Sequence, residues 1–197
     1  MDDSTARMIL ASASPRRRDL LTQAGYAFDV VPSDIDEEAF SADGHSPAQY
    51  AQVLALAKAR SVAPRYPDRI VLGADTIVDC EGEIIGKPVD EADAERITRK
   101  LFSRPHEVIT SLALLRLADR VEIVRSEVTT VYPRQLNDQQ IAAHIAGRTW
   151  EGKAGAYGIQ ETGDEFVERI DGSFTNVMGL PMELLQQLLA RVLHGSR

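Results

Sequence analysis

The sequence predicts a single α/β domain built on a mixed β-sheet, with a cleft. Strand and helix patterns alternate through the first half of its 197 residues, as they do in α/β folds. Between residues 106 and 132, two long β-prone runs flank the short segment 118–120, which predicts an antiparallel hairpin and therefore a mixed sheet. No repeat, low-complexity tract or flexible linker divides the chain, which favours one domain over residues 1–197 rather than two independent ones.

Capping residues and apolar spacing justify the elements of the first half. Ser14 can cap a helix that begins at Pro15 and ends at Gly25. Ser46 and Gln49 form a capping-box pattern for a second helix. The expected order is a strand at 8–11, a helix from 15, a strand at 26–30, an acidic loop, a helix from 46, a strand at 69–79 and a helix from 90.

The second half contains the predicted hairpin and then further strands and helices. Asn137 and Gln140 form another capping-box pair, which predicts a helix that ends near residue 147. The elements expected after this helix are strands at 154–160 and 166–170, joined by a glycine-containing turn, and an amphipathic helix at 180–193.

The composition indicates a globular protein that does not bind nucleic acid or membranes through its overall charge. Hydrophobic residues make up 44% of the chain and charged residues 26%, and the formal net charge is -8. Non-specific binding to nucleic acid or to anionic lipid requires the opposite sign. The single cysteine, Cys80, cannot form an internal disulfide, and no apolar run is long enough to span a bilayer. We therefore expect a soluble, cytoplasmic protein that binds neither nucleic acid nor membranes.

The segment at residues 12–17 is the first candidate ligand site. It runs from a predicted strand through a serine-rich loop that begins with Ser12, and into a helix N-terminus that carries Arg16 and Arg17. Amide donors, hydroxyls and two guanidinium groups would converge there on one anion, as phosphate recognition requires. An ordinary capped helix with exposed arginines is the alternative. Cations are unfavourable at a helix start, however, which favours the phosphate site.

Acidic residues are the second group of candidates. Asp75, followed by Thr76, lies in an apolar strand run, where a carboxylate is costly unless it is paired, binds a metal or lies at the mouth of a cleft. Asp75 is therefore a candidate general base or metal ligand, with a structural aspartate bonded to a turn as the alternative. Asp34, Asp36 and Glu37 in the acidic loop could supply oxygen ligands to Mg²⁺, although a solvated loop is the simpler interpretation.

Three lysines are candidates for neutralising phosphate groups. Lys58 lies on the second predicted helix, Lys87 precedes a proline, and Lys153 lies among glycines. Taken singly, each is more simply a surface lysine. The segment 147–154 has the glycine and lysine spacing of a P-loop, but it ends in Ala154, which lacks the hydroxyl that binds Mg²⁺, and it follows a predicted helix. We therefore reject a P-loop.

Taken together, these segments resemble the Maf nucleotide pyrophosphatases, in order and through nearly the whole chain. The matching segments read ILASASPRRRDLL, SDIDEE, LALAKA, GADTIV, GKP, HEVITS, GKAGAYGIQ and GSFTNVMGLPMELL. The resemblance implies an elongated α/β fold that is shared with the inosine triphosphate pyrophosphatases. In that fold helices flank a mixed, twisted sheet, and two lobes surround a central cleft.

Three positions resemble the subgroup that acts on dTTP and UTP. That subgroup carries arginine, threonine and glutamine where this chain has Arg16, Thr76 and Gln160, whereas relatives that act on 7-methyl-GTP tend to carry an aromatic residue, glutamine and glutamate. A glutamine amide both donates and accepts hydrogen bonds, which suits the O4 and N3–H edge of uracil or thymine. The resemblance therefore implies hydrolysis of dTTP, UTP or modified pyrimidine triphosphates to the monophosphate and pyrophosphate. A pyrophosphatase for 7-methyl-GTP or another modified nucleotide is one alternative, and a non-catalytic nucleotide-binding regulator of cell division is another.

The resemblance also implies a role for each candidate residue. Asp75 corresponds to the proton acceptor for the attacking water and, with Glu37, to the site of a divalent cation, Mg²⁺ or Mn²⁺. The phosphate-facing positions correspond to Ser12, Arg16, Arg17, Lys58, Lys87 and Lys153. A housecleaning role is implied, and homodimers are common in the family, although no strip of residues here indicates an interface. The chain departs from the family pattern at Val53, Ser103 and Thr149, which leaves the core motifs intact.

Overall fold

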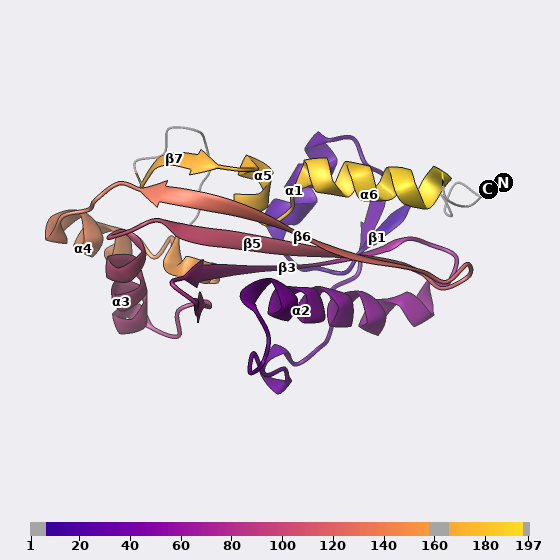
Figure 1. The fold of residues 1–197 in the computed structure, drawn as a ribbon, viewed down its shortest axis with the longest axis horizontal. Helices are drawn as coiled ribbons and strands as arrows, with labels where there is room; N and C mark the ends of the chain where they lie inside the picture. The colour runs from indigo at the N-terminus through magenta and orange to yellow at the C-terminus, as the bar shows by residue number, and fades with distance from the viewer. Residues whose placement is uncertain (1–6, 158–165, 195–197) are drawn as a thin grey trace.

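Seven strands form one mixed β-sheet in the part of the chain that the computed structural model describes, residues 7–157 and 166–194 (Figure 1). The strands are β1 (Met8–Leu10), β2 (Phe28–Val30), β3 (Val71–Cys80), β4 (Glu83–Ile85), β5 (His106–Arg116), β6 (Val121–Pro133) and β7 (Val167–Asp171). Their order is β2-β1-β3-β5-β6-β7, and β4 pairs with β3 off this path. β1 runs parallel to β2 and β3, and the other pairs are antiparallel, so the predicted mixed sheet and the long β5–β6 hairpin are confirmed.

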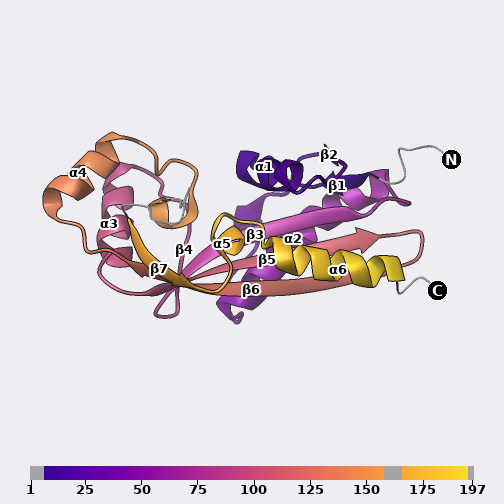
Figure 2. The same cartoon turned by 90° about the horizontal axis from the view of Figure 1, so that it is seen from above.

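Helices cover both faces of the sheet and one of its ends. They are α1 (Pro15–Gln23), α2 (Pro47–Val62), α3 (Glu91–Leu101), α4 (Asp138–Ala146), α5 (Phe174–Val177) and α6 (Met182–His194), with 3₁₀ turns η2 (Glu37–Ala39), η3 (Ala63–Arg65) and η4 (Ala154–Ala156). α2 lies along one face and α6 along the other, while α3 and α4 gather with β7 at the far end of an elongated molecule (Figures 1 and 2). No helix within the described ranges combines the length and the apolar character needed to cross a membrane.

The alternation of side chains along β3 decides which helix each residue meets. Leu72 packs in one apolar cluster with Leu185 of α6, whereas Val71 packs in another with Ala55 of α2. A Cβ on Gly73 would lie only 2.2 Å from the backbone oxygen of Ala55. The missing side chain at residue 73 therefore lets α2 approach β3 closely, which brings the side chains of the next turn of α2 onto the strand.

The helix starts follow the capping signals in the sequence, with one difference. The side chains and backbones of Ser46 and Gln49 bond reciprocally, and Asn137 and Gln140 do the same, so both predicted capping boxes are confirmed. Ser14 occupies the N-cap position of α1, but its side chain makes no capping bond. The hydroxyl of the residue two positions earlier instead accepts from the Ser14 amide.

The strand predicted at residues 154–160 is wrong where the structure describes it. Residues 154–156 form the η4 turn, and residues 158–160 lie outside the described residues. Gly155 adopts a φ of 74° and packs against Val78 and Leu101. The apolar residues there are buried because a turn packs onto β3 and α3, which the sequence pattern does not distinguish from a buried strand.

Candidate functional site

A buried ion pair joins α2 to β3 at the centre of the sheet. Lys58 Nζ donates to Asp75 Oδ1 at 2.6 Å, and the two residues are 6% and 5% exposed. The close approach at Gly73 makes this contact possible, since Asp75 follows two residues later on the same face of β3. The other carboxylate oxygen, Asp75 Oδ2, is buried and has no hydrogen-bond partner among the described residues. A buried carboxylate with one oxygen held and the other unpaired is uncommon in a purely structural role.

Glu37 brings the acidic loop to the same ammonium group. Its Oε1 lies 2.9 Å from Lys58 Nζ, and its side chain is 45% exposed. Partial burial by itself would raise the pKa of Glu37, but the hydrogen bond from Lys58 and the attraction of Lys58, Lys87 and Arg17 lower that pKa overall. Glu37 is thus an ionised carboxylate that contacts Lys58 through Oε1 and remains partly exposed to solvent.

Arg17 crosses from α1 to the opposite face of β3. Its Nη1 donates to Ser12 Oγ at 3.1 Å and to Ala74 O at 2.9 Å. Its Nε donates to Gly179 O at 2.8 Å, and its Nη2 donates to Thr76 Oγ1 at 3.1 Å. Burial lowers the pKa of this guanidinium, and its neighbour Arg16 lowers it further, while the Asp75 and Glu37 carboxylates act in the opposite direction.

These contacts gather at a gap in the pairing of β3. On one edge, β1 pairs with β3 only as far as Leu72, and β4 pairs with that edge only from Val78. Between them, the described residues place no strand on this edge. Asp75 projects to the α2 face and Thr76 to the α1 face beside the gap. In open α/β sheets, ligands commonly bind where the neighbours of a strand diverge.

A second hydrogen-bond cluster, which no sequence pattern predicted, lies behind Thr76. Thr76 Oγ1 and Thr110 Oγ1 are 2.9 Å apart, and Thr110 Oγ1 donates to Asn176 O at 3.0 Å. The Asn176 side chain, fully buried in α5, accepts from Thr110 N and donates to Val108 O and Thr129 Oγ1. The sequence signal for this cluster was a polar residue in each of two apolar segments. No sequence pattern, however, indicates that residues 110 and 176 are in contact.

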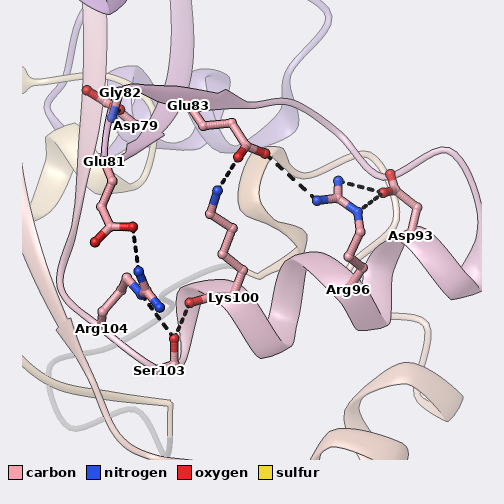
Figure 3. Close-up of polar contacts among 9 residues, drawn as sticks. All are labelled: Asp79, Glu81, Gly82, Glu83, Asp93, Arg96, Lys100, Ser103 and Arg104. Atoms are coloured by element: carbon pink, nitrogen blue, oxygen red, sulfur yellow. Dashed lines mark hydrogen bonds and ion pairs between the residues drawn. The ribbon is translucent and has the colours of Figure 1, made fainter.

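The predicted lysines at residues 87 and 153 lie on segments that bond to each other. Gly155 N donates to Gly86 O at 3.1 Å, so the turn after Lys153 meets the loop that carries Lys87. Figure 3 shows how α3 holds this loop: Glu83, at the start of β4, contacts both Lys100 and Arg96. Lys87 itself is exposed, and its charge is close enough to lower the pKa of Glu37.

The structure therefore brings together most of the predicted site residues. Lys58, Asp75 and Glu37 are bonded on one face of β3, and Ser12, Arg17 and Thr76 are bonded on the other, with Arg16 half-buried beside them. The two groups flank the same gap, and the Asp75 and Glu37 carboxylates are close enough to raise the pKa of Arg17 against the effect of burial. Gln160 lies outside the described residues. Across residues 7–157 and 166–194, no three His, Cys, Asp or Glu side chains form a metal-binding group. Glu37 and Asp75, which share Lys58, are the pair that could hold a cation together with a ligand's own oxygens.

The chain is similar to known proteins over almost its full length. The family model described as Maf-like protein matches residues 7–192. Proteins named dTTP/UTP pyrophosphatase from Geobacter sulfurreducens and Geobacter metallireducens are 50% and 48% identical, over 92% and 93% of this chain and 95% of each relative. One from Ruminiclostridium cellulolyticum is 42% identical over 94% of this chain and 95% of its own length.

The fold has a more distant likeness among solved structures. The Staphylococcus aureus Ham1 protein superposes with a TM-score of 0.52 at 14% sequence identity, over 97% of this chain and all of the other. At this identity the likeness concerns the fold alone, and it agrees with the predicted elongated α/β architecture. With a matching family model over nearly every described residue and relatives at up to 50% identity, the chain belongs to the family of Maf-like proteins.

Proposed function

We propose that the protein is a nucleoside triphosphate pyrophosphatase that hydrolyses dTTP and UTP to the monophosphate and pyrophosphate. The observation that carries the proposal is the Asp75 carboxylate, with one oxygen fixed by Lys58 and the other without a partner in residues 7–157 and 166–194, at a gap in the sheet. Relatives that share 42% to 50% of its residues are named for this substrate pair. Asp75, Lys58 and Arg17 are the kinds of group that water activation and phosphate binding require.

Asp75 acts as the general base. Lys58 orients the carboxylate through Oδ1, so Oδ2 accepts the proton of the attacking water. The water oxygen forms a bond to the α-phosphorus, and the bond from this phosphorus to the oxygen that bridges the α- and β-phosphates breaks. The electron pair leaves with pyrophosphate. The proton on Asp75 passes to solvent and restores the carboxylate.

Ser12 and the cationic side chains bind the phosphate oxygens. The Ser12 hydroxyl accepts from the Ser14 amide and from Arg17, so its own hydrogen is available for a phosphate oxygen. Four of the five N–H groups of Arg17 bond to described residues, so this residue both holds the site together and leaves one N–H for the ligand within that part of the chain. Arg16, Lys87 and Lys153 supply further positive charge.

The donor set fits a divalent cation. Asp75 Oδ2 has no partner among the described residues, so one of its lone pairs can face a cation while the other faces the water. The exposed part of the Glu37 carboxylate could supply a second oxygen to Mg²⁺ or Mn²⁺. Mg²⁺ is commonly held by one or two carboxylates together with substrate phosphates. When bound there, the cation would neutralise charge on the transferring phosphoryl group.

Base selection is assigned to Arg16, Thr76 and Gln160, in line with the resemblance to the dTTP and UTP subgroup. We also propose a cytoplasmic housecleaning role, with a homodimer as its assembly. The buried free thiol of Cys80 and the net charge of -8 agree with a reducing compartment and a small-molecule substrate rather than nucleic acid.

The test is pyrophosphate release from a panel of nucleoside triphosphates with Mg²⁺ or Mn²⁺. We expect turnover of UTP and dTTP, and a loss of about 10²- to 10⁴-fold in kcat for Asp75→Asn with nucleotide binding retained. Asp79→Asn is the matched control, because Asp79 lies on the same face of β3 and its carboxylate accepts from the Gly82 amide in the β3–β4 turn, away from Lys58. Equal kinetics for Asp75→Asn and the parent would remove Asp75 from the mechanism. Turnover confined to 7-methyl-GTP would overturn the proposed substrate.

A further inference from the structure

The hydroxyl hydrogens of Thr76 and Thr110 can be placed from their partners. Three contacts form a line: Arg17 Nη2 to Thr76 Oγ1 at 3.1 Å, Thr76 Oγ1 to Thr110 Oγ1 at 2.9 Å, and Thr110 Oγ1 to Asn176 O at 3.0 Å. A guanidinium only donates and a carbonyl only accepts. The Thr110 hydrogen must therefore point to Asn176 O. The Thr76 hydrogen must then point to Thr110, because only this placement gives every contact a hydrogen.

The position of Asn176 fixes the end of this line. Its amide group donates to Val108 O and Thr129 Oγ1 and accepts from Thr110 N, so the orientation of the amide follows from its partners. Asn176 is 0% exposed. Gly179, three residues later, accepts from Arg17 Nε, so the same turn of chain also orients the guanidinium. Buried polar networks in which every group is satisfied hold their members in a single arrangement.

Thr76, unlike its buried partners, is partly exposed beside the gap in the sheet. Its single hydrogen is engaged by Thr110, and one of its two lone pairs accepts from Arg17. Since no other described residue bonds to this oxygen, one lone pair remains for a ligand. The nearest atom to a Cβ built on Gly179 is Thr76 Oγ1, at 3.4 Å, so a residue without a side chain lies next to this hydroxyl.

We infer that Thr110 and Asn176 are positioning residues that make Thr76 an obligate hydrogen-bond acceptor toward the base of the bound nucleotide. The inference rests on the proposed function, in which Thr76 contacts the base. Within a nucleotide, uracil and thymine share a single N–H, at N3, so this is the group that Thr76 accepts from. In this arrangement the amide of Gln160 would serve as the donor to O4 rather than as the acceptor of the N3 hydrogen. Cytosine carries an acceptor nitrogen at the same position, and two acceptors facing each other leave one unpaired. The hydrogen-bond chain from Thr76 through Thr110 to Asn176 thus favours binding of uracil and thymine over cytosine.

Equilibrium dissociation constants for UTP and CTP, measured without divalent metal, test the inference independently of turnover. Thr110→Val keeps the shape of the side chain and removes the acceptor for Thr76, whose hydrogen can then be donated to cytosine N3. We expect the preference for UTP over CTP to fall by about fivefold to tenfold. Thr110→Ser, which keeps the hydroxyl, should retain the preference.

Two further variants keep the inference falsifiable. Thr98→Val is the matched control, because Thr98 is a buried threonine that donates to a backbone carbonyl in α3, and it should leave the ratio unchanged. If Thr110→Val does not fold, Thr76→Val removes the accepting lone pair directly and should narrow the preference to a similar extent. An unchanged ratio of dissociation constants in folded Thr110→Val or Thr76→Val overturns the inference. If the ratio of dissociation constants changes as expected but the parent protein turns over no nucleoside triphosphate, the proposed function is overturned instead.

Discussion

Replacing Lys58 by methionine tests the ion pair at the centre of the site. Methionine fills a similar volume, so the main change is the loss of the ammonium from a pair that is 2.6 Å apart and almost fully buried. Asp75 would then be a buried carboxylate with neither oxygen bonded, since Oδ2 already has no partner among the described residues. Removing one partner of a buried pair costs about 3–5 kcal/mol. Glu37 adds little to this loss, because its half-exposed carboxylate can be hydrated.

The measurement is thermal unfolding at neutral pH without metal. For a domain of this size, each kcal/mol shifts Tm by roughly 2–4 °C, so Lys58→Met should lower Tm by roughly 6–20 °C. Lys100→Met is the control, since Lys100 pairs with Glu83 at the surface and its loss should cost no more than about 1 kcal/mol.

A double variant and a metal titration separate the effect of the lost charge from the effect of altered packing. The double variant Lys58→Met with Asp75→Leu replaces the pair by apolar groups and should recover most of the lost stability while remaining inactive. Mg²⁺ or Mn²⁺ should raise the Tm of Lys58→Met more than that of the double variant, because a cation that binds only the folded state stabilises it by mass action. A Tm of Lys58→Met within about 2 °C of the parent would refute the reasoning, since Asp75 would then not depend on Lys58.

Three other predictions concern stability. Gly73→Ala should displace α2 from β3 and cost about 1–3 kcal/mol, whereas Gly86→Ala, which meets no atom within 4 Å, should change Tm little; equal Tm values would contradict the packing argument. Burial lowers the pKa of His106 from 6.5 to about 4, so the unfolded chain binds a proton that the folded chain does not, and stability should fall by roughly 3 kcal/mol as pH drops from 6.5 to 4. The free energy of unfolding of His106→Gln, measured by chemical unfolding at these pH values, should decline less steeply than that of the parent. An identical decline would exclude His106 as its source. Ser46→Ala should cost about 1 kcal/mol in urea unfolding through the lost capping box, and an unchanged midpoint would show that the box contributes nothing.

Much of the fold could be predicted because its signals are local. The Ser46–Gln49 capping box depends on residues three apart, and the hairpin of β5 and β6 depends on two β-prone runs with a short turn between them. The segment around Gly155 was predicted wrongly for a related reason. Its apolar residues are buried by β3 and α3, which lie far away in sequence, and burial alone does not distinguish a strand from a packed turn.

The sequence by itself determined which chemical groups the protein has and the local frame that carries them. It indicated a carboxylate in an apolar strand at Asp75, and cations near a helix start and on the second helix. Only the tertiary structure decided how these groups are paired. The approach of α2 at Gly73 places Lys58 on Asp75, and the turn at Asn176 fixes the hydrogen of Thr76 through Thr110. Hydrogen bonds and ion pairs act over about 3 Å between residues up to 162 positions apart, and the close approach of such residues is set by packing of the whole sheet rather than by any local pattern.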